Sequence, residues 1–268
     1  MPDDPNASAA TSVLMIRPAG FGFNEGTAAS NQFQTRPAAI APEMLQANAL
    51  REFNVLAGAI RRSGVEVIVV DDRPEPGTPD AVFPNNWISF HADGTVVLYP
   101  MCAPSRRLER RADLIPILQE KYGFGVTRIV DLSRHEEEGR FLEGTGSIVF
   151  DHLNRTAYAN LSARTHPELL AELSQLLGYD PVLFHATDRE GKAIYHTNVV
   201  MSIGTDFAIV ATEAIRDSGE RLALIDRLEA TGRRLVRIDL DQMERFAGNV
   251  LEVKGMDAKP VLVMSAAA

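Results

Sequence analysis

Polar side chains that can transfer protons or bind small polar groups recur just ahead of short β-rich segments. His196 precedes the apolar run 199–203 and can act as a general acid or base near neutral pH. Glu143 lies in the glycine-rich string 142–147, where the backbone can approach a ligand closely and a carboxylate can bind a cationic or amide-bearing one. The same position ahead of a β-rich segment is occupied by Asp80, Asn85, Asn86, Asn198 and Asn249.

Each of these residues also has a purely structural interpretation. His196 at the start of a strand is alternatively a buried, hydrogen-bonded histidine, and Glu143 an exposed acid in a turn. Asn85 and Asn86, between a proline and the only tryptophan, are alternatively turn residues. The matching places of His196, Glu143 and Asn86 in successive units favour one shared site. The other five histidines share no spacing and are expected to face solvent or to cap loops.

The elements that must position these residues form a repeat of about 50–60 residues. Four pairs of β-rich runs flank polar turns, at 87–90 and 95–99, 147–150 and 156–159, 199–203 and 207–211, and 250–253 and 260–264. Amphipathic helices are predicted over 108–119, 167–177 and 221–230, and each leads into an apolar strand. An earlier unit has a strand at 13–17, a helix near 48–62 and a strand at 65–70. The pattern predicts an α/β fold of repeated strand–strand–helix–strand units, with an evenly spaced α/β sandwich as the alternative.

Counting the units predicts that the last one is incomplete. Its hairpin covers 250–264, and the sequence stops at Ala268 without a helix and a closing strand. Either the first strand closes the ring in another way, or the sequence is a fragment. Residues 1–12 are predicted to be a disordered tail, and residues 13–268 a single domain.

Composition narrows the class of protein. The apolar runs are strand-length, so no membrane span is expected, and a net charge of −9 argues against nucleic-acid binding. The single cysteine, Cys102, excludes a disulfide framework and favours the cytoplasm. No zinc-ligand pattern, phosphate-binding loop or dinucleotide fingerprint is present, so neither a metal nor a cofactor is expected. The expected partner is a small molecule, and a homo-oligomer is left open.

Several strings of the chain resemble one known group of enzymes. They are 21–25 (FGFNE), 79–87 (PDAVFPNNW), 103–107 (APSRR), 142–147 (LEGTGS), 195–198 (YHTN) and 247–249 (AGN). In these strings the chain resembles the guanidino-group-modifying enzymes, or pentein superfamily, and is most similar to its amidinotransferase-like branch of citrulline-utilisation hydrolases. The resemblance runs from near residue 13 to residue 265.

The resemblance implies a five-fold pseudosymmetric propeller of strand–strand–helix–strand units and a covalent mechanism without a cofactor. In that mechanism a cysteine thiolate attacks the central carbon of a guanidino or ureido group, and a histidine passes protons. By position, His196 matches the family histidine and Glu143 the acid that binds the substrate. Asn24, Asp80 and Arg106 are expected among the substrate-binding residues, and the candidates for binding the substrate carboxylate are Arg17, Arg106 and Arg140.

Two departures from the family pattern refine the expected substrate. The deiminases have an acid where Asn86 lies, and often another where Asn198 lies. An amide can both donate and accept hydrogen bonds, whereas a carboxylate can only accept. The two amides therefore favour a neutral ureido substrate over a charged guanidinium, and the expected reaction is hydrolysis of citrulline to ornithine.

The second departure concerns the nucleophile. Val250 lies where dimethylaminohydrolases have their cysteine, directly after the position of Asn249, and no glycine-rich cysteine stretch follows. Cys102 is interpreted as a structural thiol, and the expected nucleophile lies in a C-terminal segment missing from this sequence. The alternatives are a catalytically silent paralogue that binds an arginine- or citrulline-like ligand, an arginine deiminase or amidinotransferase, and an enzyme in which Cys102 or Ser202 is the nucleophile.

Overall fold

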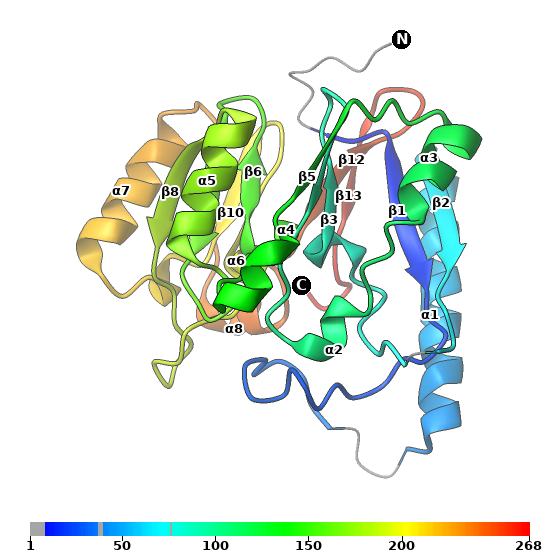
Figure 1. The fold of residues 1–268 in the computed structure, drawn as a ribbon. Helices are drawn as coiled ribbons and strands as arrows, with labels where there is room; N and C mark the ends of the chain where they lie inside the picture. The colour runs from blue at the N-terminus through cyan, green and yellow to red at the C-terminus, as the bar shows by residue number, and fades with distance from the viewer. Residues whose placement is uncertain (1–8, 37–39, 76) are drawn as a thin grey trace.

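The structure is a computed structural model that describes residues 9–36, 40–75 and 77–268. The chain forms small sheets with helices outside them: Figure 1 places α5 and α7 at one side of the molecule, α1 and α3 at the other, and the strands between them. No helix of the described residues is both long and apolar enough to cross a membrane.

Three units share one order of elements: a short helical turn, an antiparallel pair of strands, a helix, and a third strand parallel to the second strand. The second unit of the chain consists of η1 (Pro84–Asn86), β3 (Ile88–Phe90), β4 (Thr95–Leu98), α3 (Leu114–Tyr122) and β5 (Arg128–Asp131). The third consists of α4 (Gly144–Ser147), β6 (Val149–Asp151), β7 (Thr156–Asn160), α5 (Pro167–Leu177) and β8 (Asp180–Phe184). The fourth consists of α6 (Thr197–Val200), β9 (Met201–Ile203), β10 (Phe207–Val210), α7 (Ser218–Glu229) and β11 (Arg234–Arg237). The connections contain α2 (Pro104–Arg107), η2 (Ser133–Glu138), η3 (Thr212–Ala214) and α8 (Leu240–Glu244). The predicted α/β repeat is confirmed.

The middle strand is the most buried strand in the second and third units. All residues of β4 and β7 are buried, because neighbouring strands pair with both edges and other elements cover both faces. The third strands β5 and β8 are mostly exposed on their outer side. Burial therefore decreases from the middle strand of a unit to its outer strand.

The first and last units of the chain pack against each other. β1 (Ser12–Arg17) pairs in parallel with β2 (Glu66–Asp71) across α1 (Pro42–Arg62), and β12 (Leu251–Lys254) pairs antiparallel with β13 (Pro260–Val263). One core joins Phe53 and Ile60 of α1 to Val253 of β12, with Val261 and Val263 of β13 packed against it. Among the described residues, β13 has only β12 as a strand partner.

The predicted N-terminal tail overlaps this contact. Residues 1–8 lie outside the described residues. Ala9 is buried, and Ala10 forms a parallel bridge with Val253 and accepts a hydrogen bond of 2.8 Å from the Lys254 N–H. Residues 9–12 therefore belong to the folded domain, because their backbone continues β1 alongside β12.

The boundaries of several predicted elements were wrong. Ser147, Val199 and Val200 were assigned to strands but lie in the helical turns α4 and α6 that precede the hairpins. Four residues are too few to show a helical period, so only their apolar character was visible. The predicted helix 108–119 starts at Leu114. The predicted helix 221–230 starts earlier, at Ser218, after the N-cap Asp217, whose side chain accepts from the Glu220 N–H.

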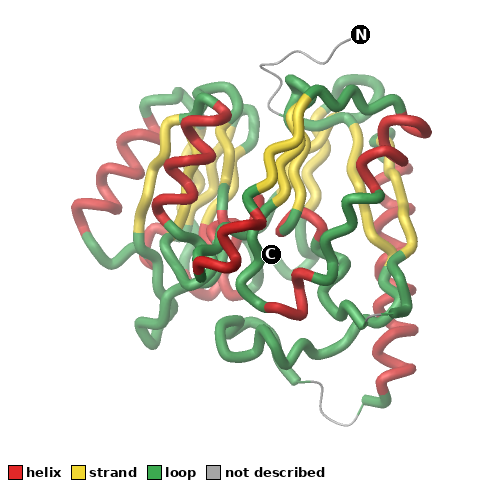
Figure 2. The backbone as a smooth tube through the Cα atoms, viewed as in Figure 1, coloured by secondary structure: helices red, strands yellow, loops and turns green. Residues whose placement is uncertain are grey.

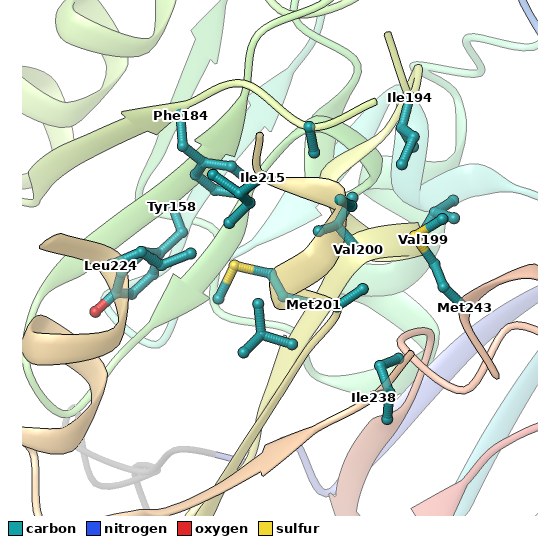
Figure 3. Packing of buried hydrophobic residues seen from close by; sticks show 14 of the residues in the cluster. Tyr158, Phe184, Ile194, Val199, Val200, Met201, Ile215, Leu224, Ile238 and Met243 are labelled. Carbon is teal, nitrogen blue, oxygen red and sulfur yellow. The ribbon is translucent and has the colours of Figure 1, made fainter. Parts of the chain in front are cut away.

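Adjacent units share their apolar cores. Figure 3 shows Tyr158 and Phe184 of the third unit beside Met201 and Leu224 of the fourth, all within one buried cluster. Figure 2 shows that the backbone at the lower end of the strands forms loops and short helices. The strands and the helices that pack on them therefore supply the cores, and Asn86, Glu143 and His196 lie on or beside the short turns.

A buried ion pair joins the third and fourth units. Arg233 Nη1 and Nη2 donate to Asp151 Oδ2 and Oδ1 at 2.7 and 2.9 Å, and Asp151 is fully buried. We expect Arg233→Met to lower the free energy of unfolding by about 3–5 kcal/mol, because it leaves a buried carboxylate without its counter-ion. Arg237→Met, at an exposed pair with Glu229, should change it by less than about 1 kcal/mol. Urea titration of both variants measures the difference, and equal losses would contradict the role of the buried pair.

Candidate active site

Three short helical turns meet near the middle of the molecule. The turn α4 contacts both η1 and α6, and Figure 1 shows α4, α6 and α2 gathered at one end of the strands. Asn86 is the last residue of η1, Glu143 directly precedes α4, and His196 directly precedes α6. Three residues predicted from different units are thus brought together.

A glycine makes this close approach possible. Gly144 has a φ of +47°, and a Cβ atom there would lie 2.1 Å from the backbone oxygen of Asn85. Thr145 Oγ1 donates to the same oxygen at 3.4 Å. The backbone of η1 therefore rests directly on the glycine-rich string that carries Glu143.

Glu143 and His196 form a buried pair. His196 Nε2 lies 2.8 Å from Glu143 Oε2, with Glu143 fully buried and His196 5% exposed. The second carboxylate oxygen, Oε1, accepts a 3.0 Å hydrogen bond from the Cys102 N–H. The alternative of an exposed acid at Glu143 is therefore wrong.

Glu143 is ionised in this environment. Burial acts to raise the pKa of Glu143, but the hydrogen bond and charge of His196 and the charges of Arg164 and Arg106 outweigh it and lower the pKa to about 2. Arg164 Nη1 lies 3.3 Å and Arg106 Nη1 3.9 Å from Glu143 Oε2. The site thus contains a stable buried carboxylate.

His196 is neutral and its protonated nitrogen is determined. Burial lowers the pKa of His196 to about 4, although the hydrogen bond to Glu143 and the charge of Glu143 act to raise it. A neutral imidazole facing a carboxylate must donate to it, so Nε2 carries the proton. Nδ1 is then unprotonated, and His196 is a base held in one tautomer.

The free nitrogen of His196 lies next to the amide nitrogen of Asn86. A Cβ atom at Gly146 would lie 2.4 Å from Asn86 Nδ2 and 2.7 Å from His196 Nδ1. The absence of a side chain at Gly146 therefore allows a hydrogen-bond donor, Asn86 Nδ2, and a base, His196 Nδ1, to lie together against its backbone. This arrangement can orient a polar group and move a proton to or from it.

Arg106 lies in the site, with each guanidinium nitrogen already bonded within the chain. Nη1 donates to Asn86 Oδ1 at 2.8 Å, while Nε and Nη2 donate to the carboxylate of Glu109. Nη2 also lies 3.4 Å from the Asp80 backbone oxygen. Burial raises the pKa of Glu109 to about 7, although the charge and hydrogen bonds of Arg106 act to lower it. Arg106 and Glu109 are both almost fully buried.

The segment after β1 covers one side of this group. Asn24 is buried, and its Nδ2 donates to Asp80 Oδ2 at 2.7 Å. Further along, Ser30 Oγ accepts a 2.7 Å hydrogen bond from Arg164 Nη2. Asn24, Asp80 and Arg106 therefore lie together with Asn86 on the side of the second unit.

The remaining predicted residues lie less deeply. Asn85 and Asn198 are partly buried in η1 and α6, and Asn249 is exposed. The neighbouring Gly248 packs against α6, since a Cβ there would lie 2.4 Å from the Val199 oxygen. The structure thus gathers the polar set around α4 and α6, with Asn249 at its edge.

Arg164 is a site residue that the sequence did not reveal. Besides contacting Glu143 and Ser30, its guanidinium stacks on Tyr195, with 4.7 Å between the guanidinium carbon and the ring centroid. Arg164 lies just ahead of α5, where a basic residue is unfavourable to the helix dipole, and this was the one available signal. Glu109 was also missed.

Cys102 is near the site through its backbone. Its thiol is partly buried, and burial, followed by the charge of Glu143, raises its pKa. A raised pKa leaves less thiolate, which is the nucleophilic form. Ser202 lies in β9 and is buried. No group of three or more His, Cys, Asp or Glu among the described residues is arranged to hold a metal ion.

His135 differs from the expectation for the other histidines. It is buried, and its Nδ1 lies 3.0 Å from Glu138 Oε2. This pair is on the η2 connection and outside the group around Glu143.

Comparison with known proteins identifies relatives of this arrangement. A model of the family described as N,N dimethylarginine dimethylhydrolase, eukaryotic, matches residues 17–268. None of the curated proteins matches the chain significantly.

Solved structures share the fold at low identity. The apo structure of ArgZ, an arginine dihydrolase from the ornithine-ammonia cycle in Cyanobacteria, is 19% identical with a TM-score of 0.69, covering 90% of this chain and 33% of that chain. The substrate-bound N-terminal domain of ArgZ gives the same identity and TM-score and is covered to 80%. A dimethylarginine dimethylaminohydrolase in adduct with S-methyl-L-thiocitrulline is 16% identical with a TM-score of 0.60, covering 96% of this chain and 85% of that chain. This chain therefore spans about a third of the full ArgZ chain.

The buried histidine predicts a pH dependence of stability. The pKa of His196 in the folded protein, about 4, lies below its ordinary value of 6.5, and burial lowers the pKa of His91 to about 4 as well. As the pH falls from 6.5 towards 4, the unfolded chain takes up these protons first, so stability is lost on acidification. Urea titrations at pH 7 and 5 measure the loss, and His91→Gln should reduce it. A histidine NMR titration that places protonation of His196 near pH 6.5 would overturn the assignment.

The close contact of Gly146 with Asn86 and His196 gives a second prediction. Gly146→Ala would place a Cβ against Asn86 Nδ2 and the His196 ring, and we expect a loss of about 1–3 kcal/mol in unfolding free energy. Gly125→Ala is the matched control, because a Cβ there meets nothing within 4 Å. Thermal unfolding of both variants tests this, and a Gly146→Ala protein as stable as the control would contradict the close contact.

Proposed function

The chain belongs to the N,N-dimethylarginine dimethylhydrolase family, and through it to the guanidino-group-modifying (pentein) superfamily; on this basis we propose that it carries the substrate-binding and proton-transferring residues of a C–N hydrolase. The observation that supports the proposal best is the Glu143–His196 pair, which holds a neutral imidazole in one tautomer. Its Nδ1 lies beside Asn86 Nδ2 over Gly146. A reacting carbon bound beside these two groups would have a base and a hydrogen-bond donor next to it.

The proposed substrate is a ureido compound, with citrulline hydrolysed to ornithine as the reaction. Two amides, Asn86 and Asn198, lie where related deiminases have acids. A ureido group has a carbonyl oxygen that accepts hydrogen bonds, and an amide NH₂ can donate to it. A guanidinium presents only N–H donors, for which a carboxylate is the better partner.

In the proposed mechanism a thiolate attacks the ureido carbon, and the carbonyl oxygen gains negative charge as the tetrahedral adduct forms. Asn86 Nδ2 stabilises that charge by donation. His196 Nδ1 takes the proton that the thiol loses and passes it to the leaving nitrogen as the C–N bond breaks and ornithine departs. The neutral His196 then removes a proton from the water that hydrolyses the carbamoyl thioester to carbamate and the free thiol. Glu143 stabilises the imidazolium that forms transiently, because its carboxylate stays ionised 2.8 Å from Nε2.

The thiolate in this proposal is not Cys102. Burial and the charge of Glu143 raise the pKa of Cys102, which disfavours its ionised form. The intact mass of the natural protein, compared with 29.3 kDa, tests whether sequence beyond residue 268 supplies the nucleophile. Cys102→Ala should retain turnover, whereas loss of turnover with unchanged citrulline binding would make Cys102 the nucleophile.

A second candidate function is ligand binding without catalysis. Cys102 is the one cysteine of the sequence, and its raised pKa disfavours the nucleophilic thiolate. If the natural protein has no other thiol, binding without hydrolysis is therefore favoured. Binding of citrulline without release of ornithine or ammonia by the natural protein would select it.

The proposal also includes a cellular location and further residues that contact the substrate. The single cysteine supports a reducing, cytoplasmic location. Asn24, Asp80, Asn85 and Asn249 are proposed to contact the substrate or its immediate neighbours, and a homo-oligomer is left open.

We expect Asn86→Asp to reverse the substrate preference. A carboxylate at residue 86 would keep one oxygen on Arg106 and turn the other towards the substrate, so affinity for citrulline should fall by about tenfold and affinity for arginine should rise. Calorimetric titration of the wild-type and variant proteins with both amino acids measures the change. A wild-type protein that binds or hydrolyses arginine better than citrulline would refute the ureido proposal.

A second variant, His196→Ala, tests the role of the histidine in proton transfer. It should lower kcat by about 10²–10⁴-fold, because the proton transfers lose their base. Citrulline binding should change far less, since Asn86 is retained. Unchanged turnover of His196→Ala, measured as ornithine release, would exclude the proposed mechanism.

A further inference from the structure

The orientation of the Asn86 side chain is determined by Arg106. Arg106 Nη1 donates to Asn86 Oδ1 at 2.8 Å. A guanidinium has five N–H donors and no acceptor, so only the amide oxygen can face it. The NH₂ group of Asn86 must therefore point the other way, towards Gly146 and the ring of His196.

Arg106 is itself held in one position. Its Nε lies 3.1 and 3.2 Å from the two carboxylate oxygens of Glu109, and its Nη2 lies 2.8 Å from Glu109 Oε2. Asp80 adds a backbone oxygen at 3.4 Å from Nη2 and a carboxylate oxygen at 3.7 Å from Nε. Because Arg106 and Glu109 are 2% and 3% exposed, water cannot replace these partners, and the guanidinium cannot turn away from Asn86.

We propose that Arg106, held by Glu109, is a positioning residue that commits Asn86 to hydrogen-bond donation and so selects substrates whose reacting group presents an acceptor oxygen. The inference rests on the proposed function. It adds that Arg106 and Glu109, which lie on the oxygen side of the Asn86 amide, determine the substrate specificity. An unrestrained asparagine would rotate its carboxamide and accept from a guanidinium as readily as it donates to a ureido oxygen. With Arg106 in place, that rotation would put N–H groups against N–H groups.

The charge of Arg106 is matched by the acids around it. Glu109, Asp80 and Glu143 all lie within 4 Å of its nitrogens. Removing Arg106 alone would leave Glu109 buried and unpaired, which is strongly destabilising. The test therefore replaces the buried pair together.

The main variant is the double substitution Arg106→Met with Glu109→Leu in the full-length protein. Apolar side chains of similar volume can replace a buried ion pair without large loss of stability. They remove the donor from Asn86 Oδ1, so the amide is free to rotate. We expect the ratio of citrulline affinity to arginine affinity, measured by calorimetry, to fall by about tenfold, the value of one hydrogen bond to a charged or polar partner.

Arg106→Lys with Glu109 retained is the matched control. An ammonium also has donors and no acceptor, so it can keep Asn86 Oδ1 turned towards it. We expect this variant to retain the wild-type affinity ratio even if both affinities fall. If the ratio falls equally in Arg106→Lys, or is unchanged in the double variant, the positioning role is overturned.

A measurement on the wild-type protein keeps the inference testable if the double variant does not fold. The side-chain NH₂ signal of Asn86 in ¹⁵N NMR can be identified by its loss in Asn86→Asp. Citrulline should shift this signal and arginine should not, because only the ureido oxygen accepts from it. A signal that neither ligand moves, although citrulline binds, would contradict the inference. A wild-type protein that binds neither ligand, or prefers arginine, would instead contradict the proposed function.

Discussion

The burial of one carboxylate imposes the conditions that the rest of the site meets. Glu143 is removed from water completely, and an ionised acid is stable there only if charges and hydrogen bonds replace its hydration. His196, Arg164 and the Cys102 N–H supply those contacts, and they come from three different parts of the chain. The histidine in turn owes its neutral state and its tautomer to the same burial. The geometry of the base is therefore a consequence of how the carboxylate is enclosed.

The repeat explains why such an enclosure can form. Each complete unit begins with a short helical turn, and the apolar strands behind it pack against the strands of the next unit. The turns η1, α4 and α6 are thereby brought to one place, and each contributes a polar residue at or beside it. Different elements therefore provide the stability and the chemistry of the protein. The sheets bury apolar side chains, while the turns position Asn86, Glu143 and His196. The ArgZ and dimethylaminohydrolase structures share the fold at 19% and 16% identity, so the fold tolerates large changes of sequence.

The sequence predicted what depends on local pattern. The helix 167–177 was predicted with both of its ends, and Gly178, which follows it, adopts the left-handed conformation. Turns of three or four residues have no detectable period, so η1, α4 and α6 were not predicted as helical, and the last residues of α4 and α6 were assigned to the following strands. Long-range partners were also out of reach: Arg164 lies 21 residues from Glu143 and 134 from Ser30, and nothing local links them. The direction in which the Asn86 amide points depends on Arg106, 20 residues away, and no residue type encodes it.

The segment that follows β1 has a consequence for how the protein is made. Its contacts reach far along the chain: Ser30 bonds to Arg164, Gln32 to Asp188, and the Ala29 oxygen to Lys192, at separations of 134, 156 and 163 residues. Loops of this length are slow to close, and a chain is synthesised from its N-terminus. This segment therefore waits for its partners until residue 192 has emerged from the ribosome. A nascent chain shorter than that has its early strands but no enclosed carboxylate, so the chemistry of the site arrives with the later units.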